Sequence, residues 1–69
     1  MKESLNLVKG YRNMMNLTQE DVANKLGMTK QAYSLKENGK TPYNDKEKVI
    51  LLNIFKRADP TLTIERLFF

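Results

Sequence analysis

Four side chains near the middle of the chain have the chemistry needed to contact the edges of DNA bases. The ammonium of Lys30 can bond the O6 and N7 atoms of guanine, and the amide of Gln31 can pair with the N6 and N7 atoms of adenine. On a helix, Ser34 lies one turn further along and shares their face. Leu35, four residues after Gln31, can press on a thymine methyl group or fill a gap in a core. Each of the four also has an ordinary interpretation as a surface or packing residue, so they are candidate base contacts.

The segment that carries these residues is predicted to form two short helices around a glycine turn. Residues 17–37 read LTQEDVANKLGMTKQAYSLKE. The first helix is expected to begin after a cap at Thr18, answered three residues later by Asp21, and to end at Gly27, which can take the left-handed conformation. Thr29 can cap the second helix. This order of caps, turn and donors is typical of the helix-turn-helix, which places its second helix in the DNA major groove.

The turn after the second helix has groups suited to the phosphate backbone of DNA. Asn38 and Gly39 favour a tight turn, while Lys40 and Thr41 add an ammonium and a hydroxyl. Such groups fix the register of a protein on DNA without reading its sequence. A plain Asn-Gly turn also accounts for these residues, and the two interpretations are compatible.

Composition narrows the classes of function. The 69 residues hold no cysteine and no histidine, no glycine-rich phosphate loop and no carboxylate cluster at metal-ligand spacing. These features argue against an enzyme, a metal site or a bound cofactor. Between Lys25 and Lys48, six lysines stand against three acidic residues, and the net charge of +4 suits a polyanionic partner as well as a solvated lysine-rich surface. Apolar runs are too short for a signal peptide or a membrane span, so we expect no membrane partner. The lack of cysteine agrees with a reducing cytosol, and we expect a cytoplasmic protein. We also expect no small-molecule ligand.

The hydrophobic pattern is all helical and has no alternating run long enough for a secure strand. It predicts an all-α fold in one domain over residues 1–69, a compact bundle of four to five helices. The helix-turn-helix unit covers about 18–37, and the segment 44–69 completes the core and offers a possible dimer surface. The expected helices cover about 3–15, 19–26, 30–37 and 44–57, with a last short turn around 63–67.

Two of these helices have ambiguous faces. The inner side of the first is formed either by Leu7, Tyr11 and Met14 or by Leu5, Val8 and Met15. In the helix after Asn44, whose cap is paired with Glu47, the side chains of Leu51, Leu52 and Phe55 can point at the core together.

The segment resembles the helix-turn-helix of the Cro and phage-repressor family, also called the xenobiotic-response-element (XRE) family. A looser similarity runs from about residue 5 to the C-terminus, and it implies a lambda-repressor-like fold. The family pattern is met by Leu17, Thr18, Gln19, Glu20, Val22, Ala23, Leu26, Gly27, Met28, Thr29, Tyr33, Ser34, Glu37, Gly39 and Pro42.

The resemblance also implies roles for particular residues. In the family, the glutamine that opens the first helix of the unit touches a DNA phosphate, which here is Gln19; the alternative is a plain exposed glutamine. Thr29 joins it as a candidate phosphate contact. An arginine of the family's first helix pairs with the glutamate that ends the groove helix, which here implies an internal pair between Arg12 and Glu37.

At two positions the sequence departs from the commonest family pattern, which has aliphatic residues at both. Tyr33 is expected to place its ring in the core with its hydroxyl at the rim. Lys36 is expected to lay its stem over the core and to lift its ammonium outward as an additional phosphate contact.

Together these features lead us to expect a sequence-specific transcriptional regulator of double-stranded DNA, similar to small phage or mobile-element repressors. A half-site read by only three or four side chains favours a homodimer on an inverted repeat. An antitoxin-like protein-interaction module, for which DNA binding is secondary, is the alternative and would use the same apolar C-terminal surface. The candidate residues of that surface are Ile50, Ile54, Leu62, Phe68 and Phe69.

Overall fold

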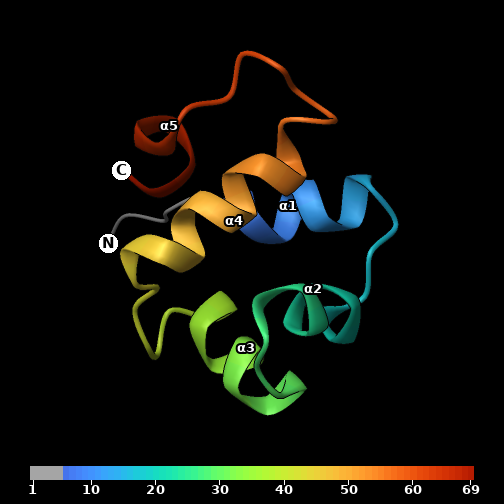
Figure 1. The fold of residues 1–69 in the computed structure, drawn as a ribbon, viewed down its shortest axis with the longest axis vertical. Coiled ribbons are helices and arrows are strands. Elements are labelled where there is room, and N and C mark those ends of the chain that lie inside the picture. Colours follow the sequence, from blue (N-terminus) through green and yellow to red (C-terminus); the bar gives the residue numbers. More distant parts are fainter. Residues whose placement is uncertain (1–5) are drawn as a thin grey trace.

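Every helix of the structure begins after a short polar residue whose side chain accepts a hydrogen bond from the backbone N–H three positions later. The computed structural model describes residues 6–69. Within them the chain forms five helices and no strand, as expected for the all-α class (Figure 1). The helices are α1 (Leu7–Met14), α2 (Gln19–Leu26), α3 (Lys30–Glu37), α4 (Asp45–Phe55) and α5 (Ile64–Phe68). Their capping residues are Asn6, Thr18, Thr29, Asn44 and Thr63.

Helices α2 and α3 have the bounds and the caps that the sequence predicts. The hydroxyl of Thr18 accepts from the N–H of Asp21 at 3.0 Å, and the carboxylate of Asp21 accepts from the N–H of Thr18 at 2.8 Å. Gly27 ends α2 with φ +73°, in the left-handed region that favours glycine. Met28 then donates its N–H to the carbonyl of Ala23 at 3.0 Å, which turns the chain toward α3. The bounds of α2 and the turn toward α3 are therefore set mainly by local hydrogen bonds.

Helix α1 packs residues of both candidate faces against the core. It begins at Leu7 behind the Asn6 cap, so the start of the predicted helix, including Leu5, lies outside the described residues. Val8 is buried, whereas Met14 is 64% exposed. Met15 packs against the core beside Val8, and so do Leu7 and Tyr11 of the other predicted face. The assignment of Met14 to the inner side is wrong, because that end of the helix turns its side chain toward solvent.

The core contains side chains from all five helices and from the loop before α5. Helices α1 and α4 cross the middle of the molecule, with α2 and α3 on one side and α5 on the other (Figure 1). Leu62 is only 1% exposed, because a hydrogen bond from its N–H to the carbonyl of Asp59 folds the loop and its side chain inward. Its assignment to a dimer surface is therefore wrong. The buried apolar residues are Val8, Val22, Ala23, Tyr33, Leu51, Phe55, Leu62 and Leu67.

Helix α4 ends at Phe55, two residues earlier than expected, because the chain turns there toward the loop before α5. Leu51 and Phe55 are fully buried, while Leu52 is half-buried at the edge of the core. None of the helices in residues 6–69 is long and apolar enough to cross a membrane.

The remaining candidates for a dimer surface lie on two different sides of α4. Lys48 and Ile50 are two residues apart and therefore project about 200° apart around the helix. The ammonium of Lys48 lies 5.7 Å from the ring centroid of Phe68 and 4.8 Å from that of Phe69. Ile50 instead lines a groove together with Ile54. The expected single apolar surface is thus wrong: one part is the end of α5, and the other is a groove on the opposite side of α4.

Candidate nucleic-acid interface

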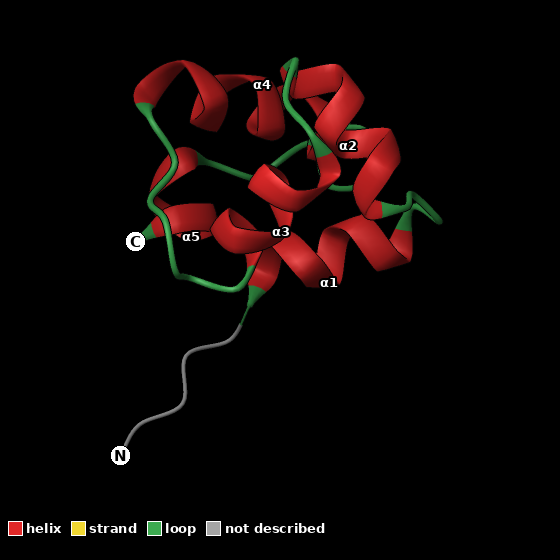
Figure 2. Ribbon diagram, turned by 90° about the horizontal axis from the view of Figure 1, so that it is seen from below, coloured by secondary structure: helices red, strands yellow, loops and turns green. Residues whose placement is uncertain are grey.

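One side of α3 forms the wall of an open hollow of about 470 Å³. Lys30 and Gln31 are exposed and Ser34 is half-buried, so all three can be reached from outside. Leu35 is 48% exposed, which excludes its alternative role in the core. In Figure 2, α3 occupies the centre of the view with the other helices around it. The residues that line the hollow are Gln19, Lys30, Gln31, Ser34 and Leu35, so the four candidate base contacts share one surface with Gln19.

Gln19 connects this surface to the interior. It is half-buried, and its Nε2 atom donates to Oε1 of Glu37 at 2.7 Å, so it is not a plain exposed glutamine. One N–H of the amide is engaged in this bond, while the second N–H and the carbonyl oxygen remain for a ligand. Gln19 is also the first residue of α2, where backbone N–H groups have no partner within the helix. A second hollow of about 520 Å³ opens here, lined by Arg12, Asn13, Asn16, Leu17, Thr18, Gln19, Glu20 and Lys30.

Beneath Gln19 lies a buried ion pair between α1 and α3. The Nε atom of Arg12 lies 2.6 Å from Oε2 of Glu37, and its Nη2 atom lies 3.3 Å from Oε1. A further guanidinium N–H donates to the carbonyl of Leu17 at 2.8 Å. The hydroxyl of Tyr33 donates to Oε2 of Glu37 at 3.0 Å, so this hydroxyl is buried and not at the rim as expected. The pair implied by the resemblance is present, and it holds the last turn of α3 against α1.

The electrostatics of this cluster favour the ionised pair. Burial by itself raises the pKa of Glu37, but the hydrogen bonds from Arg12, Gln19 and Tyr33 outweigh it, so the pKa lies below its ordinary value. The hydrogen bond to Glu37 likewise raises the pKa of Arg12. At neutral pH both groups are charged and compensate each other. Arg12 therefore supports the fold, and its charge is not free for an anionic ligand.

The turn after α3 is fastened to the end of that helix. Gly39 adopts φ +81°, and the N–H groups of Lys40 and Thr41 both donate to the carbonyl of Leu35, at 2.9 and 3.3 Å. The side chain of Lys40 is exposed. Asn38 is exposed as well, and its amide donates to the hydroxyl of Ser34 at 3.4 Å. The side chains of Asn38 and Lys40, which are proposed to contact phosphates, thus lie close to the hollow on the outer side of α3.

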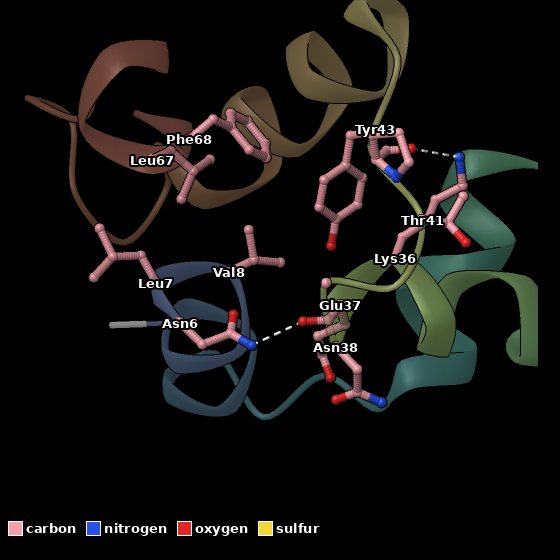
Figure 3. Close-up of a pocket in the computed structure, with 12 residues that line it drawn as sticks. Asn6, Leu7, Val8, Lys36, Glu37, Asn38, Thr41, Tyr43, Leu67 and Phe68 are labelled. Atoms are coloured by element: carbon pink, nitrogen blue, oxygen red, sulfur yellow. Dashed lines mark hydrogen bonds between the residues drawn. The ribbon is translucent and has the colours of Figure 1, made fainter. Parts of the chain in front are cut away.

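A cavity of about 490 Å³ lies behind this turn, between α1, α3 and α5 (Figure 3). Asn6 donates from its side-chain amide to the carbonyl of Glu37 at 2.8 Å, shown as a dashed line in Figure 3. The ring of Tyr43 packs edge-on against Phe68, with centroids 5.4 Å apart. Its hydroxyl is buried and makes no hydrogen bond within residues 6–69. Ring packing, and not a polar contact, therefore anchors the far end of the turn.

Two candidate phosphate contacts have structural roles. The ammonium of Lys36 lies 2.9 Å from Oε1 of Glu47 and also donates to the carbonyl of Pro42 at 3.2 Å. The side chain is only 15% exposed, so the expectation of an outward ammonium is wrong: the acidic first turn of α4 attracts it inward. The hydroxyl of Thr29 accepts from the N–H of Ala32 at 3.1 Å as the α3 cap, although its own proton can still be donated.

Two contacts were missed by the sequence interpretation. Asn6, which holds the end of α3, was not singled out, although a short polar residue before an apolar run is a recognisable helix cap. The bond between Gln19 and Glu37 joins residues 18 positions apart, and no local pattern indicates it.

Comparison with known proteins agrees with this geometry. A family model described as helix-turn-helix matches residues 8–45, which is more than half of the chain and includes α2, α3 and the turn after α3. No curated protein and no solved structure matches the chain.

Proposed function

The chain belongs to the helix-turn-helix family of the Cro and XRE type and is a DNA-binding transcriptional regulator, and from this premise we propose that it acts as a homodimeric repressor on an inverted repeat. The observation that carries the proposal is the hollow on the outer side of α3. Its lining offers the donors of Lys30 and Gln31 and the apolar surface of Leu35. These groups match the edges of bases in the major groove.

In this proposal, α3 enters the major groove and its exposed side chains read the bases. The side chains of Lys30 and Gln31 make no hydrogen bond within residues 6–69, so their donors need not leave a protein partner to reach DNA. Lys30 suits a guanine, Gln31 suits an adenine, and Leu35 suits a thymine methyl group. Ser34 lies between them and can bond either a base or a phosphate.

Phosphate contacts on both sides of α3 would set its position in the groove. On one side, Gln19 and the first N–H groups of α2 face the second hollow, and a helix N-terminus favours an anion. On the other side lie the side chains of Asn38, Lys40 and Thr41. Because Glu37 holds the Gln19 amide, little conformational entropy is lost when this amide meets a phosphate.

A homodimer follows from the small number of base contacts in each subunit. Each good contact supplies about 1–3 kcal/mol of discrimination, so one half-site distinguishes an operator poorly from bulk DNA. We place the dimer contact at the end of α5, where Phe69 is 84% exposed beside Phe68 and Lys48. The exposed ring of Phe69, continuous with the half-buried ring of Phe68, gives the end of α5 an apolar surface that a second subunit could cover. The proposed repressor would be of the kind carried by phages or mobile elements.

The direct test is selection of bound sequences from a random pool of double-stranded DNA with the purified protein. We expect enrichment of an inverted repeat whose half-sites lie about one helical turn apart. The variant Gln31→Ala should lose preference at one base pair of each half-site. Asn24→Ala, an exposed change on α2 outside both hollows, should select the same repeat as the unaltered protein.

The outcomes separate the parts of the proposal. A single enriched half-site would reject the homodimer, and an unchanged selection by Gln31→Ala would reject α3 as the reading element. Failure to enrich any sequence, also at low salt, would reject operator binding.

A further inference from the structure

A groove of about 350 Å³ lies between α2, α4 and the turn that joins α1 to α2. It shares no residue with the hollow on the outer side of α3, and only Leu17 with the second hollow beside Gln19. We call it the lateral groove; its lining residues are Met15, Leu17, Lys25, Ile50, Asn53, Ile54 and Arg57. A partner in this groove would touch none of the residues proposed to read bases.

The apolar part of the lateral groove is formed by two isoleucines of α4 that face Met15 and Leu17 on the turn before α2. Ile50, Asn53, Ile54 and Arg57 follow the spacing i, i+3, i+4 and i+7, so they form one stripe along α4 and its end. The two isoleucines are half-buried, as are Met15 and Leu17 on the facing turn. Part of each apolar side chain thus stays open to a ligand although the core is already closed.

The charged residues of the lateral groove are both basic. Lys25 and Arg57 are exposed, and within residues 6–69 neither lies within 4.0 Å of a carboxylate. Asp21 lies one turn before Lys25, but its carboxylate is engaged in the α2 cap with Thr18. No carboxylate lines the groove itself. An apolar centre with two cations beside it is complementary to a ligand that is apolar at its centre and negatively charged at its flanks.

We propose that the lateral groove docks a short amphipathic helix of an acidic partner protein. Apolar side chains of that helix enter between the α1–α2 turn and α4, and flanking carboxylates meet Lys25 and Arg57. Grooves between helices bind amphipathic helices through apolar anchors at i, i+3, i+4 and i+7 of the bound helix, and here Ile50, Ile54, Met15 and Leu17 would receive them. The regulator would then hold a second protein while α3 remains free for DNA.

Two other occupants fit the lateral groove less well. A DNA backbone would match the cations but would leave the isoleucine floor without an apolar partner. A second copy of this chain carries a net charge of +4, and its exposed Phe69 lies beneath the ammonium of Lys48, so it would bring like charge to the two cations. Acidic polypeptide is the chemistry that satisfies both the floor and the charges.

The probe is a synthetic helical peptide of about 14 residues with leucines at i, i+3, i+4 and i+7 and glutamates beside them. A second peptide has lysine in place of every glutamate. Titration of the isotope-labelled protein, followed by amide chemical shifts, should place the acidic peptide at the residues of the lateral groove. The lysine peptide should bind at least about tenfold more weakly.

Charge reversal makes the test specific. The double variant Lys25→Glu with Arg57→Glu should reverse this preference. The control is Lys9→Glu with Lys56→Glu, which reverses two exposed lysines outside the groove and gives the same net charge. That control should keep the preference for the acidic peptide.

Several results would overturn the proposal. These are no binding of the acidic peptide below about 1 mM, equal binding by both double variants, or shifts centred on α3 or α5. Groove shifts that grow with protein concentration in the absence of peptide would assign the groove to a second copy. Groove shifts caused by a DNA duplex would assign it to DNA.

Discussion

The side-chain amide of Gln19 donates to Oε1 of Glu37 at 2.7 Å, across 18 positions of the chain. The same carboxylate receives Arg12 at 2.6 Å and the hydroxyl of Tyr33 at 3.0 Å. One buried acid therefore joins α1 and α3 and also orients the first side chain of α2, which faces the hollow proposed to meet DNA. The fold and the proposed interface share this group, so a change at Glu37 should affect both.

The first prediction concerns the stability that Glu37 provides. Glu37→Gln leaves the buried Arg12 guanidinium without a countercharge, and we expect the free energy of unfolding to fall by about 3 kcal/mol. Urea unfolding followed by circular dichroism measures the change. Glu20→Gln, an exposed acid at the start of α2, should stay within about 0.5 kcal/mol of the unaltered protein. Equal stability of the two variants would show that the ion pair does not support the fold.

The second prediction is a loss of stability in acid. The pKa of Glu37 is lowered in the folded protein from an ordinary value of 4.5, and those of Asp21, Glu47 and Asp59 are lowered as well. An acid whose pKa is lowered by folding stabilises the fold fully when the pH is above its pKa in the unfolded chain. That stabilisation is lost as the pH falls through its pKa in the folded protein. Unfolding free energy should therefore decline below about pH 4.5, and less steeply in Glu37→Gln, which lacks one such acid.

The same reasoning predicts a flat profile near neutral pH. The chain has no histidine and no cysteine, so no side chain of ordinary pKa titrates between about pH 6 and 8. Thermal unfolding midpoints should be equal across this pH range. A clear change of the midpoint with pH would mean that a titrating group outside the cluster around Glu37 contributes to stability.

The third prediction separates recognition from packing at Leu35. Because its side chain is 48% exposed, Leu35→Ala should change stability by no more than about 0.5 kcal/mol. Affinity for the selected operator should nevertheless fall by roughly 1 kcal/mol per half-site through the lost apolar contact. Met14→Ala removes a side chain that is 64% exposed on α1 and should alter neither quantity. Unfolding curves and fluorescence anisotropy with labelled operator provide the two readouts, and unchanged affinity in Leu35→Ala would remove it from the base contacts.

The fourth prediction distinguishes the two apolar residues once assigned to one surface. Leu62→Ala should lower the unfolding free energy by about 3 kcal/mol, because the residue is 1% exposed and leaves a cavity. Phe69→Ala, at a residue that is 84% exposed, should hardly affect the unfolding of dilute protein but should weaken the dimer. Sedimentation velocity and chemical unfolding report the two effects. A strongly destabilised Phe69→Ala protein would mean that this ring completes the core.

The fifth prediction is the salt dependence of operator binding. If about six phosphates are contacted per dimer, affinity should fall about a thousandfold between 50 and 200 mM salt. Lys40→Ala should weaken binding to all DNA sequences alike and reduce the salt slope by roughly 1 per subunit. Lys36→Ala should leave the slope unchanged, because its ammonium is paired with Glu47. A reduced slope in Lys36→Ala would restore that lysine to the phosphate contacts.

Local features of the fold were predictable because their signals are local. Thr18 and Thr29 cap α2 and α3 by accepting a hydrogen bond from the backbone N–H three residues later, and Gly27 ends α2 in the left-handed conformation that favours glycine. The bounds of both helices follow from these residues. The outer face of α3 followed as well, since helical spacing places Lys30 and Ser34 together.

Features that depend on tertiary packing could not be predicted from local sequence patterns. Periodicity identifies Leu62 as apolar but does not say whether it meets the core or a partner. Lys36 finds Glu47 across 11 positions, and that pairing depends on how the turn brings α4 back to α3. The family resemblance supplied the pair of Arg12 and Glu37, which spacing by itself does not indicate.

The outward side of α3 has a consequence for how such regulators diversify. Lys30, Gln31 and Leu35 are exposed, whereas the helix is held in place by Tyr33 and Glu37 on its inner side. Exposed substitutions of this kind cost little stability, so the outer positions can vary while the scaffold stays the same. Duplicated copies of this protein could therefore acquire separate operators through one or two substitutions each. Such copies would coexist in one cell without occupying each other's sites.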